Sequence, residues 1–387
     1  MIPYLIIFII TTFIAFKRFG KPKVSKPFFF AYCVFLGLFV GMGDMLGGYD
    51  RYIYGEVFQS IAMNTRYGDG SILEVFIRFF STEPLYGMMN ILVGSFTPNR
   101  YIFISLFTLI MYVLYADSIY RYTSNPFFSL LIFLGLMFFF SFTYLRQMMA
   151  CGVCWFAIRY VIERRFWRFL LFVVIATLIH NSAAYFLILY FIPLQKYPRV
   201  VVLRVMIFLL LIGLSGVTQY VFKIAGDSLG NEKIAGYQES AVYGLRIDYL
   251  IEAVFFLVIL LRNYSQIKTD KYNLTIFNIY LMFCGVLFLF CRNSDGGRIS
   301  WYCMIGVMVL MSDLCHPKSA VNLRSFVAIL SFGLFCRILT GWGSVGILYP
   351  YKTFLTNGHT GSEEVYQRYE YDENYDYDKL YNLTFRD

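Results

Sequence analysis

Residues 168–196 read RFLLFVVIATLIHNSAAYFLILYFIPLQK, an apolar stretch of about 27 residues between basic ends. Short basic loops favour the cytoplasmic side of a membrane, so both ends of this stretch are expected there. Two complete crossings would need about 40 residues. We therefore expect 169–193 to form a short helical hairpin or re-entrant element, with His180 near its tip and toward the outer face.

The composition of the whole chain agrees with a membrane environment. The chain has 387 residues, of which 59% are hydrophobic and only 15% charged, whereas a soluble domain has about a quarter of its residues charged. Its length allows ten or more crossings at about 20 residues each. The excess of Lys and Arg lies mainly in short loops between apolar runs, which indicates orientation in a membrane and not nucleic-acid binding.

The basic loops predict the topology. Residues 17–26 carry five positive charges and are expected in the cytoplasm, with Met1 outside. Further basic loops are expected inside at 163–168, 196–204, 262–271 and 316–324, and polar loops outside at 47–70, 223–245 and 292–298. The expected spans are 2–16, 27–46, 101–120, 126–143, 147–162, 200–222, 246–262, 274–291, 298–315 and 322–342. Residues 71–97 then begin and end outside, which predicts a second re-entrant or interfacial element.

The predicted fold class is therefore an all-α polytopic membrane protein, with about ten spanning helices plus two re-entrant or interfacial helical elements (71–97 and 169–193). Residues 1–342 form the transmembrane domain. Residues 343–387 are a tail that becomes acidic and tyrosine-rich from Glu363 onward, EEVYQRYEYDENYDYDKLY. It has too little aliphatic content to form a core. A flexible solvated tail is expected, and a cap over a cavity is the alternative.

Two ionisable residues interrupt apolar surroundings. Arg146 and Gln147 follow an aromatic run, and His180 lies at the predicted hairpin tip. A charge in hydrocarbon costs about 2.5 to 3.5 kcal/mol even on lenient scales, so such residues usually face a wet cavity. Arg146 has the alternative of a helix-end side chain that reaches the headgroups, and His180 that of a packing residue. The neutral polar Gln147 beside Arg146 favours a functional role for Arg146, and the predicted turn favours one for His180.

Other polar and aromatic residues are expected at similar depth on the outer side, and we predict that the outer ends of 47–54, 145–150, 178–184 and 292–302 converge on one cavity. Arginine binds phosphate oxygens in a fixed fork geometry, and tyrosine can stack on sugar rings, so a large anionic, hydroxyl-rich substrate suits this set. The alternatives are an aromatic belt, surface ion pairs and helix-end anchors. The candidates for substrate binding are Asp50, Arg51, Tyr54, Glu83, Gln147, Arg246, Arg298 and Tyr302.

We expect neither a metal nor a cofactor. The chain has three His residues, and its carboxylates show no ligand spacing. It has no Gly-rich phosphate loop. Cys151 and Cys154 form a C-x-x-C without a second pair nearby, so a metal reading of that motif is disfavoured.

The order of these motifs resembles a known family. Asp50 with Tyr54 is followed by Glu83-Pro84 with Tyr86, then by Leu145-Arg146-Gln147, by His180 with Ser182-Ala183, and by Arg298 to Tyr302. Over about residues 1–352 this is similar to the EpsG family, which is related to the Wzy-type polymerases of O-antigen and exopolysaccharide repeat units. The Arg-Gln block and the His-x-Ser-Ala block carry most of the resemblance.

The resemblance implies a metal-independent glycosyltransferase in the bacterial inner membrane, acting at its outer leaflet. Such enzymes move a glycan from one undecaprenyl-pyrophosphate carrier onto the terminal sugar of another carrier-linked repeat unit. Arg146 and Arg298, with Arg246 as a third candidate, would hold the pyrophosphate. His180 would be the general base, with Asp50 and Glu83 as competitors.

The implied partners are undecaprenyl-pyrophosphate-linked glycans and membrane lipids, and a chain-length regulator and a flippase are further candidates. Nucleic acid is not expected. Two other classes remain open at this point. A membrane-bound O-acyltransferase of cell-surface glycans would also use an intramembrane His, but its donor normally comes from the cytoplasm. A lipid-linked sugar transporter would need internal repeats, and none is visible in the sequence.

Overall fold

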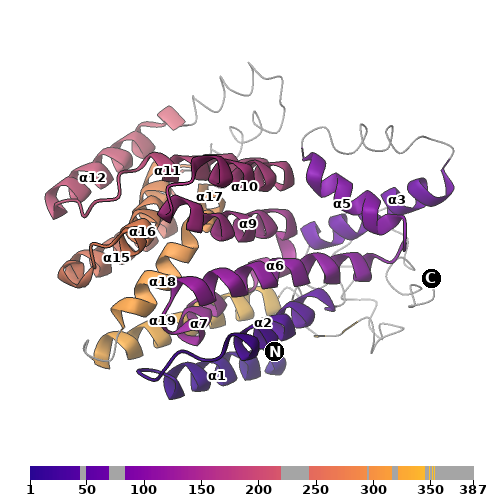
Figure 1. The fold of residues 1–387 in the computed structure, drawn as a ribbon, viewed down its shortest axis with the longest axis horizontal. Helices are drawn as coiled ribbons and strands as arrows, with labels where there is room; N and C mark the ends of the chain where they lie inside the picture. The colour runs from indigo at the N-terminus through magenta and orange to yellow at the C-terminus, as the bar shows by residue number, and fades with distance from the viewer. Residues whose placement is uncertain are drawn as a thin grey trace. The chain divides into compact units, whose positions relative to one another are not determined.

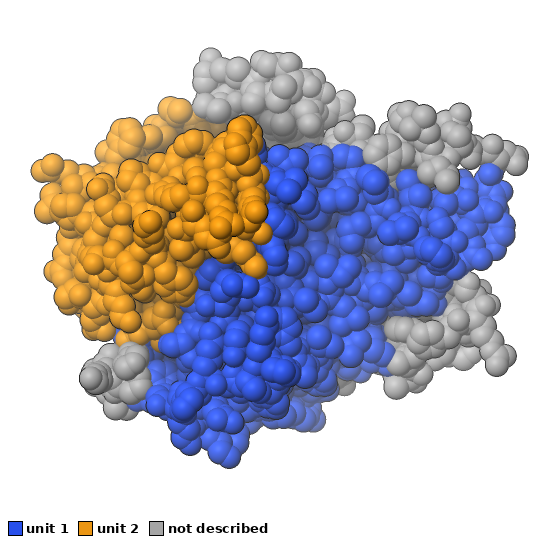
Figure 2. Space-filling model, in the orientation of Figure 1, with its two compact units in different colours: residues 1–157, 170–184, 315–387 blue, residues 158–169, 185–314 orange. Residues whose placement is uncertain are grey.

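The computed structural model describes residues 1–43, 49–68, 83–218, 244–293, 296–315 and 321–344, together with Leu348, Tyr351 and Thr353. Regular structure in these residues is helical, apart from one isolated antiparallel bridge between Gly43 and Thr353 (Figure 1). The chain divides into two compact units, 1–157 with 170–184 and 315–387, and 158–169 with 185–314 (Figure 2). Each unit is described by itself.

The helices of the first unit begin where the sequence places helix-starting residues. Four of them have proline in the first turn, where its fixed φ suits a helix and its missing N–H costs nothing. The Asn99 side chain caps α6 by accepting from the N–H groups of Tyr101 and Ile102. The helices are α1 (Ile2–Lys17), α2 (Lys26–Gly41), α3 (Tyr49–Tyr67), α5 (Pro84–Gly94), α6 (Arg100–Tyr122), α7 (Pro126–Leu136), α8 (Phe140–Thr143), α9 (Leu145–Ile162), α10 (Phe166–Ile179) and α19 (Val321–Ser344). The end of α9 and the start of α10, within 158–169, belong to the second unit.

The second unit contains most of the second arm of the hairpin and the helices that follow it. Its Asp270 side chain caps α16 by accepting from two backbone N–H groups. The Lys196 ammonium donates to the Ile267 carbonyl at 2.8 Å, and the Arg246 N–H donates to the Cys291 carbonyl at 2.7 Å. Its elements are η1 (Asn181–Leu187), which begins in the first unit, α11 (Ile188–Phe191), α12 (Arg199–Ser215), α15 (Ile247–Arg262), η3 (Tyr264–Gln266), α16 (Lys271–Leu289), α17 (Gly296–Ser300), η4 (Trp301–Cys303) and α18 (Met304–Leu314).

The apolar helices fit a multi-pass membrane protein. Among the described residues, three stretches are long and apolar enough to cross a bilayer, namely Arg100–Tyr122, Lys271–Leu289 and Leu323–Trp342. Shorter apolar helices are Ile2–Lys17, Lys26–Gly41, Pro126–Leu136, Phe166–Ile179 and Asn181–Phe191. The all-α class is confirmed for the described residues, and the number of about ten crossings stays a prediction.

The expectation of a loop at 47–70 is wrong for residues 49–67, which form the helix α3. Its placement outside the membrane stays a prediction. Its apolar stripe is short: Phe58, Ile61 and Ala62 lie three or four positions apart and are fully buried. The Phe58 ring stacks on Phe103 of α6 at 4.4 Å. The many polar residues between these positions hid the helical period. The expected span 126–143 is also interrupted, because α7 ends at Leu136 and α8 begins at Phe140.

The predicted hairpin at 169–193 is present. The Arg164 guanidinium donates to the Tyr190 carbonyl at 2.9 Å, and the rings of Phe166 and Tyr190 lie 5.1 Å apart. The two ends of the apolar stretch therefore meet, with His180 at the change from α10 to η1. Of the second expected re-entrant element, 71–97, the structure describes α5 and its flanks, and residues 69–82 lie outside the described part.

Contacts within the first unit sort the helix ends into two groups. At one end the Asn125 amide donates to the Ala15 carbonyl at 3.4 Å, and Arg324 lies over the Phe19 ring at 4.2 Å. At the other end the Tyr4 hydroxyl donates to the Leu348 carbonyl at 2.9 Å. The expected topology requires the ends of these helices to fall into two groups in this way. The assignment of the Lys-rich end to the cytoplasm stays a prediction.

Candidate functional site

Three helix termini of the first unit bring Glu83, Arg146 and His180 together. Glu83 is the residue immediately before α5, Arg146 is the second residue of α9, and His180 follows the last residue of α10. Each of these residues lies within two positions of a helix terminus. The expected proximity of Arg146 and His180 is confirmed, since both contact the same carboxylate.

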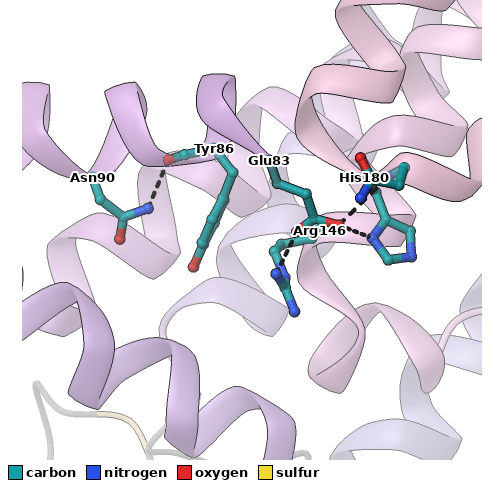
Figure 3. Close-up of polar contacts among 6 residues, drawn as sticks. Glu83, Tyr86, Asn90, Arg146 and His180 are labelled. Atoms are coloured by element: carbon teal, nitrogen blue, oxygen red, sulfur yellow. Dashed lines mark hydrogen bonds and ion pairs between the residues drawn. The ribbon is translucent and has the colours of Figure 1, made fainter. Parts of the chain in front are cut away.

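Glu83 is the centre of the cluster (Figure 3). Its Oε1 lies 2.7 Å from His180 Nδ1 and accepts a longer hydrogen bond of 3.4 Å from the Asn181 N–H. Its Oε2 accepts from Arg146 Nη1 in an ion pair. The carboxylate accepts, so Nδ1 carries the proton that faces it. The other imidazole nitrogen, Nε2, points away from Glu83 (Figure 3) and is the basic atom of a neutral ring.

Burial differs between the three side chains. The Glu83 side chain is 8% exposed, whereas those of Arg146 and His180 are 27% and 23% exposed. Burial raises the pKa of Glu83, but the hydrogen bond from His180 and the positive charge of Arg146 outweigh it, so the pKa lies below its ordinary value. The carboxylate therefore stays ionised near neutral pH, and its two partners keep surface for a ligand.

Two tyrosines flank Arg146. The guanidinium carbon lies 5.0 Å from the centre of the Tyr54 ring and 5.5 Å from that of Tyr86, and the two rings meet edge to face at 6.0 Å. Cation–π contacts of this kind restrict the position of the guanidinium. Tyr86 is nearly buried and is held by Phe103 and Phe107 of α6. Tyr86 stood in the Glu83-Pro84 motif of the sequence but was not among the candidate site residues.

The helices that carry these residues approach closely. A Cβ added at Gly94 of α5 would lie 2.9 Å from the Cα of Ala62 on α3, a distance that real side chains do not reach. Only glycine at this position allows α5 to lie against α3. The close approach sets Tyr86 of α5 beside Tyr54 of α3, and so builds both aromatic sides of the Arg146 site.

Arg51 was expected to bind substrate, and the structure gives it a different use. Its side chain is fully buried. Nη2 donates to the carbonyls of Val40, Gly41 and Gly43 at 3.0, 3.0 and 2.9 Å, and Nη1 donates to that of Phe142 at 3.3 Å. In this structure Arg51 presents no surface to a ligand and holds the C-terminal end of α2. We leave it out of the proposed substrate-binding set.

Asp50 and Gln147 are neighbours of the cluster in sequence. Asp50 lies in the first turn of α3, partly exposed and one turn before Tyr54, and Gln147 follows Arg146 and is 5% exposed. Their roles as substrate-binding residues stay predictions.

The remaining candidates belong to the second unit. Arg246 forms a two-pronged ion pair with Asp248, at 3.0 and 2.7 Å, and Arg298 lies exposed on α17. Tyr302 is fully buried, with its ring 5.5 Å from that of Tyr185, so in this structure it has no exposed face for a sugar. Whether Arg246 and Arg298 share a cavity with Arg146 stays a prediction.

The described residues contain no group of three or more His, Cys, Asp or Glu side chains placed to hold a metal ion. The chemistry that the described cluster offers is that of an anion-binding guanidinium, an oriented imidazole and a buried carboxylate.

Apolar helices around a cluster of arginine, glutamate and histidine define this protein as a multi-pass membrane protein with a polar site at one end of a helical unit. Residues 28–353 match the EpsG family, a Wzy-type polysaccharide polymerase family, and the chain belongs to it. No curated protein and no solved structure matches the chain.

Proposed function

We propose that this protein polymerises undecaprenyl-pyrophosphate-linked oligosaccharide repeat units at the outer leaflet of the bacterial inner membrane, in the synthesis of O-antigen, capsule or exopolysaccharide. Family membership supports a polysaccharide polymerase and favours it over the acyltransferase and transporter alternatives. The observation that carries the proposal is the Glu83 carboxylate, which joins Arg146 and His180 from positions 63 and 97 residues away in sequence.

The reaction needs a base for the acceptor hydroxyl. In the proposed mechanism Nε2 of His180 takes the proton of a hydroxyl on the terminal sugar of a carrier-linked repeat unit. That oxygen forms a bond to the anomeric carbon of the donor glycan, and the bond from this carbon to the pyrophosphate breaks. Glu83, ionised and bonded to Nδ1, holds the ring in one tautomer and stabilises the imidazolium that forms.

The reaction also needs a cation for the leaving group. As the bond breaks, negative charge develops on the pyrophosphate oxygen that was joined to the anomeric carbon. Arg146 is partly exposed and its position is restricted by Tyr54 and Tyr86, so it can offer its remaining N–H groups to phosphate oxygens. Arg246 and Arg298 remain candidates for the second phosphate.

The arrangement separates the roles of the three groups. Glu83 is the least exposed of them and is engaged by both partners, so we assign it to orientation and not to proton abstraction. Asp50 remains a competing base, because it lies partly exposed one turn from Tyr54. A flippase that delivers repeat units and a chain-length regulator are the proposed partners.

The proposal is tested with membranes that contain the protein and purified carrier-linked repeat units. Wild-type membranes should convert single units into a ladder of longer glycans on the carrier. Glu83→Gln should leave single units, with normal amounts of protein in the membrane. If Glu83→Gln gave the same ladder as the wild type, the contacts of Glu83 with Arg146 and His180 would have no role in the reaction.

A second carboxylate provides a matched control. Glu56 of α3 pairs with the buried Arg100 at 2.5 Å, so Glu56→Gln also removes one carboxylate from an arginine in the same unit. It leaves the contacts of Arg146 and His180 intact. Glu56→Gln should keep the ladder, and equal loss in both variants would indicate a general effect on folding.

A further inference from the structure

Leu348, Tyr351 and Thr353, which follow α19, contact the N-terminal part of the chain. The Tyr351 ring stacks on Phe39 of α2 with centres 4.2 Å apart and planes 4° from parallel, and the Tyr351 hydroxyl donates to the Phe39 carbonyl at 2.8 Å. The Leu348 side chain is fully buried, and Thr353 forms the antiparallel bridge with Gly43. Three described residues of the part expected to be a free tail therefore contact α1, α2 and the residue Gly43 that follows α2.

These contacts complete the C-terminal end of α2. The last four carbonyls of a helix lack partners within it. Here the Leu38 carbonyl accepts from the Met42 N–H at 2.8 Å, and that of Phe39 accepts from Tyr351. The carbonyls of Val40 and Gly41 accept from Arg51. The end of α2 is thus held jointly by a residue of α3 and a residue of the C-terminal segment.

Arg51 extends this connection to the candidate site in two directions. It lies three positions before Tyr54 on α3, which flanks Arg146. Its Nη1 also donates to the carbonyl of Phe142 in α8, just before the start of α9 and Arg146. A shift of the α2 end would therefore move the aromatic flank of Arg146 and the start of its helix together.

We propose that Leu348, Tyr351 and Thr353 act as a C-terminal strap that positions Arg146, through the end of α2 and Arg51. In this proposal the strap is a permanent part of the fold. The match to the EpsG family extends to residue 353 and so includes the strap. The effect on turnover rests on the proposed function, whereas the strap itself does not.

A disulfide between positions 43 and 353 tests whether the strap exists. Residues paired across an antiparallel bridge have Cα atoms about 4.5 to 5.5 Å apart, within the range that a disulfide spans. Gly43→Cys is sterically possible, because a Cβ there would make only ordinary contacts, the nearest at 3.4 Å with the Val40 carbonyl oxygen. The double variant Gly43→Cys with Thr353→Cys should give the linked peptide by mass spectrometry after mild oxidation.

The single variants are the controls, because eight native cysteines are present. A folded double variant without the linked peptide would overturn the strap. This measurement does not depend on polymerase activity, so it can succeed when the proposed function fails. If the link is absent while the wild type still polymerises, the strap fails and the function stands.

Truncation and rescue test the positioning role. Ending the chain after Thr353 should leave the glycan ladder unchanged, whereas ending it after Ser344 should reduce turnover by about tenfold or more, since small misplacements of a catalytic group are costly. Tyr351→Ala should lose turnover with near-normal protein in the membrane. Oxidation of the 43–353 disulfide in the Tyr351→Ala background should restore turnover, and reduction should remove it again.

Two results would contradict the positioning role. One is full turnover in the chain that ends after Ser344. The other is an oxidised double variant, with Tyr351 intact, that loses turnover and regains it on reduction, because a permanent strap should tolerate being locked.

Discussion

Arg51 and Arg146 are two arginines of the same helical unit with opposite surroundings. Arg51 is fully buried and donates to four backbone carbonyls. Arg146 is partly exposed, pairs with a carboxylate that also holds a histidine, and lies between two tyrosine rings. The guanidinium that holds carbonyls at a helix end serves the fold, and the one that pairs with a carboxylate bonded to a histidine is partly exposed and suits chemistry.

The largest effect is expected at the imidazole that shares Glu83 with Arg146. His180→Gln should reduce polymer formation by about 10² to 10⁴, the usual contribution of a general base, and His180→Asn should do the same. Single repeat units should remain on the carrier, with normal protein in the membrane. The glycan ladder measures polymer formation, and the carrier-linked pool measures the single repeat units that remain. A near-normal ladder from His180→Gln would move the base role to Asp50 or Glu83.

Arg146→Ala should reduce polymer formation by about 10² to 10³, the loss seen when one preorganised charge-stabilising donor is removed. Arg146→Lys should also be poor, because an ammonium cannot reproduce the fork that Tyr54 and Tyr86 orient. Protein amount should stay near that of the wild type. An unchanged ladder in Arg146→Ala would show that this arginine is a helix-end anchor, and the contrast with Arg51 would disappear.

Arg51→Met should show the reverse pattern. It leaves four carbonyls without their donor, at about 1 to 3 kcal/mol for each buried group that finds no other partner. The expected result is less folded protein in the membrane and a lower melting temperature in detergent. Turnover per folded molecule should change less than in Arg146→Ala. Normal stability of Arg51→Met would contradict the structural role.

The smallest effect is a pH dependence of stability that comes from Glu83. Its pKa is lowered in the folded protein, so its contribution is fully present above the unfolded pKa of about 4.3 and is lost as pH falls through the lower folded pKa. The difference in melting temperature between the wild type and Glu83→Gln should therefore shrink below about pH 4. A difference that grows below about pH 4 would mean that the folded pKa of Glu83 is raised.

Local patterns in the sequence determined much of this protein. Apolar runs between basic loops located most helices, because hydropathy and helix-starting residues such as Pro84 and Asn99 act within a few positions of themselves. The parity of basic ends predicted the hairpin with His180 at its tip. The motifs at Arg146 and His180 indicated the site, because an ionisable residue in an apolar run is visible without knowledge of its partners.

Tertiary structure decided which residues become partners. Glu83 joins Arg146 and His180 because three helix termini meet, and no pattern within 83–86 specifies that. Arg51 and Tyr302 looked like candidates in the sequence and are buried in the fold, and α3 was hidden because only Phe58, Ile61 and Ala62 form its apolar stripe. The role of a polar group depends on its neighbour, which can be a carbonyl, a carboxylate or an aromatic ring. Contacts between distant segments of the chain decide which neighbour it has.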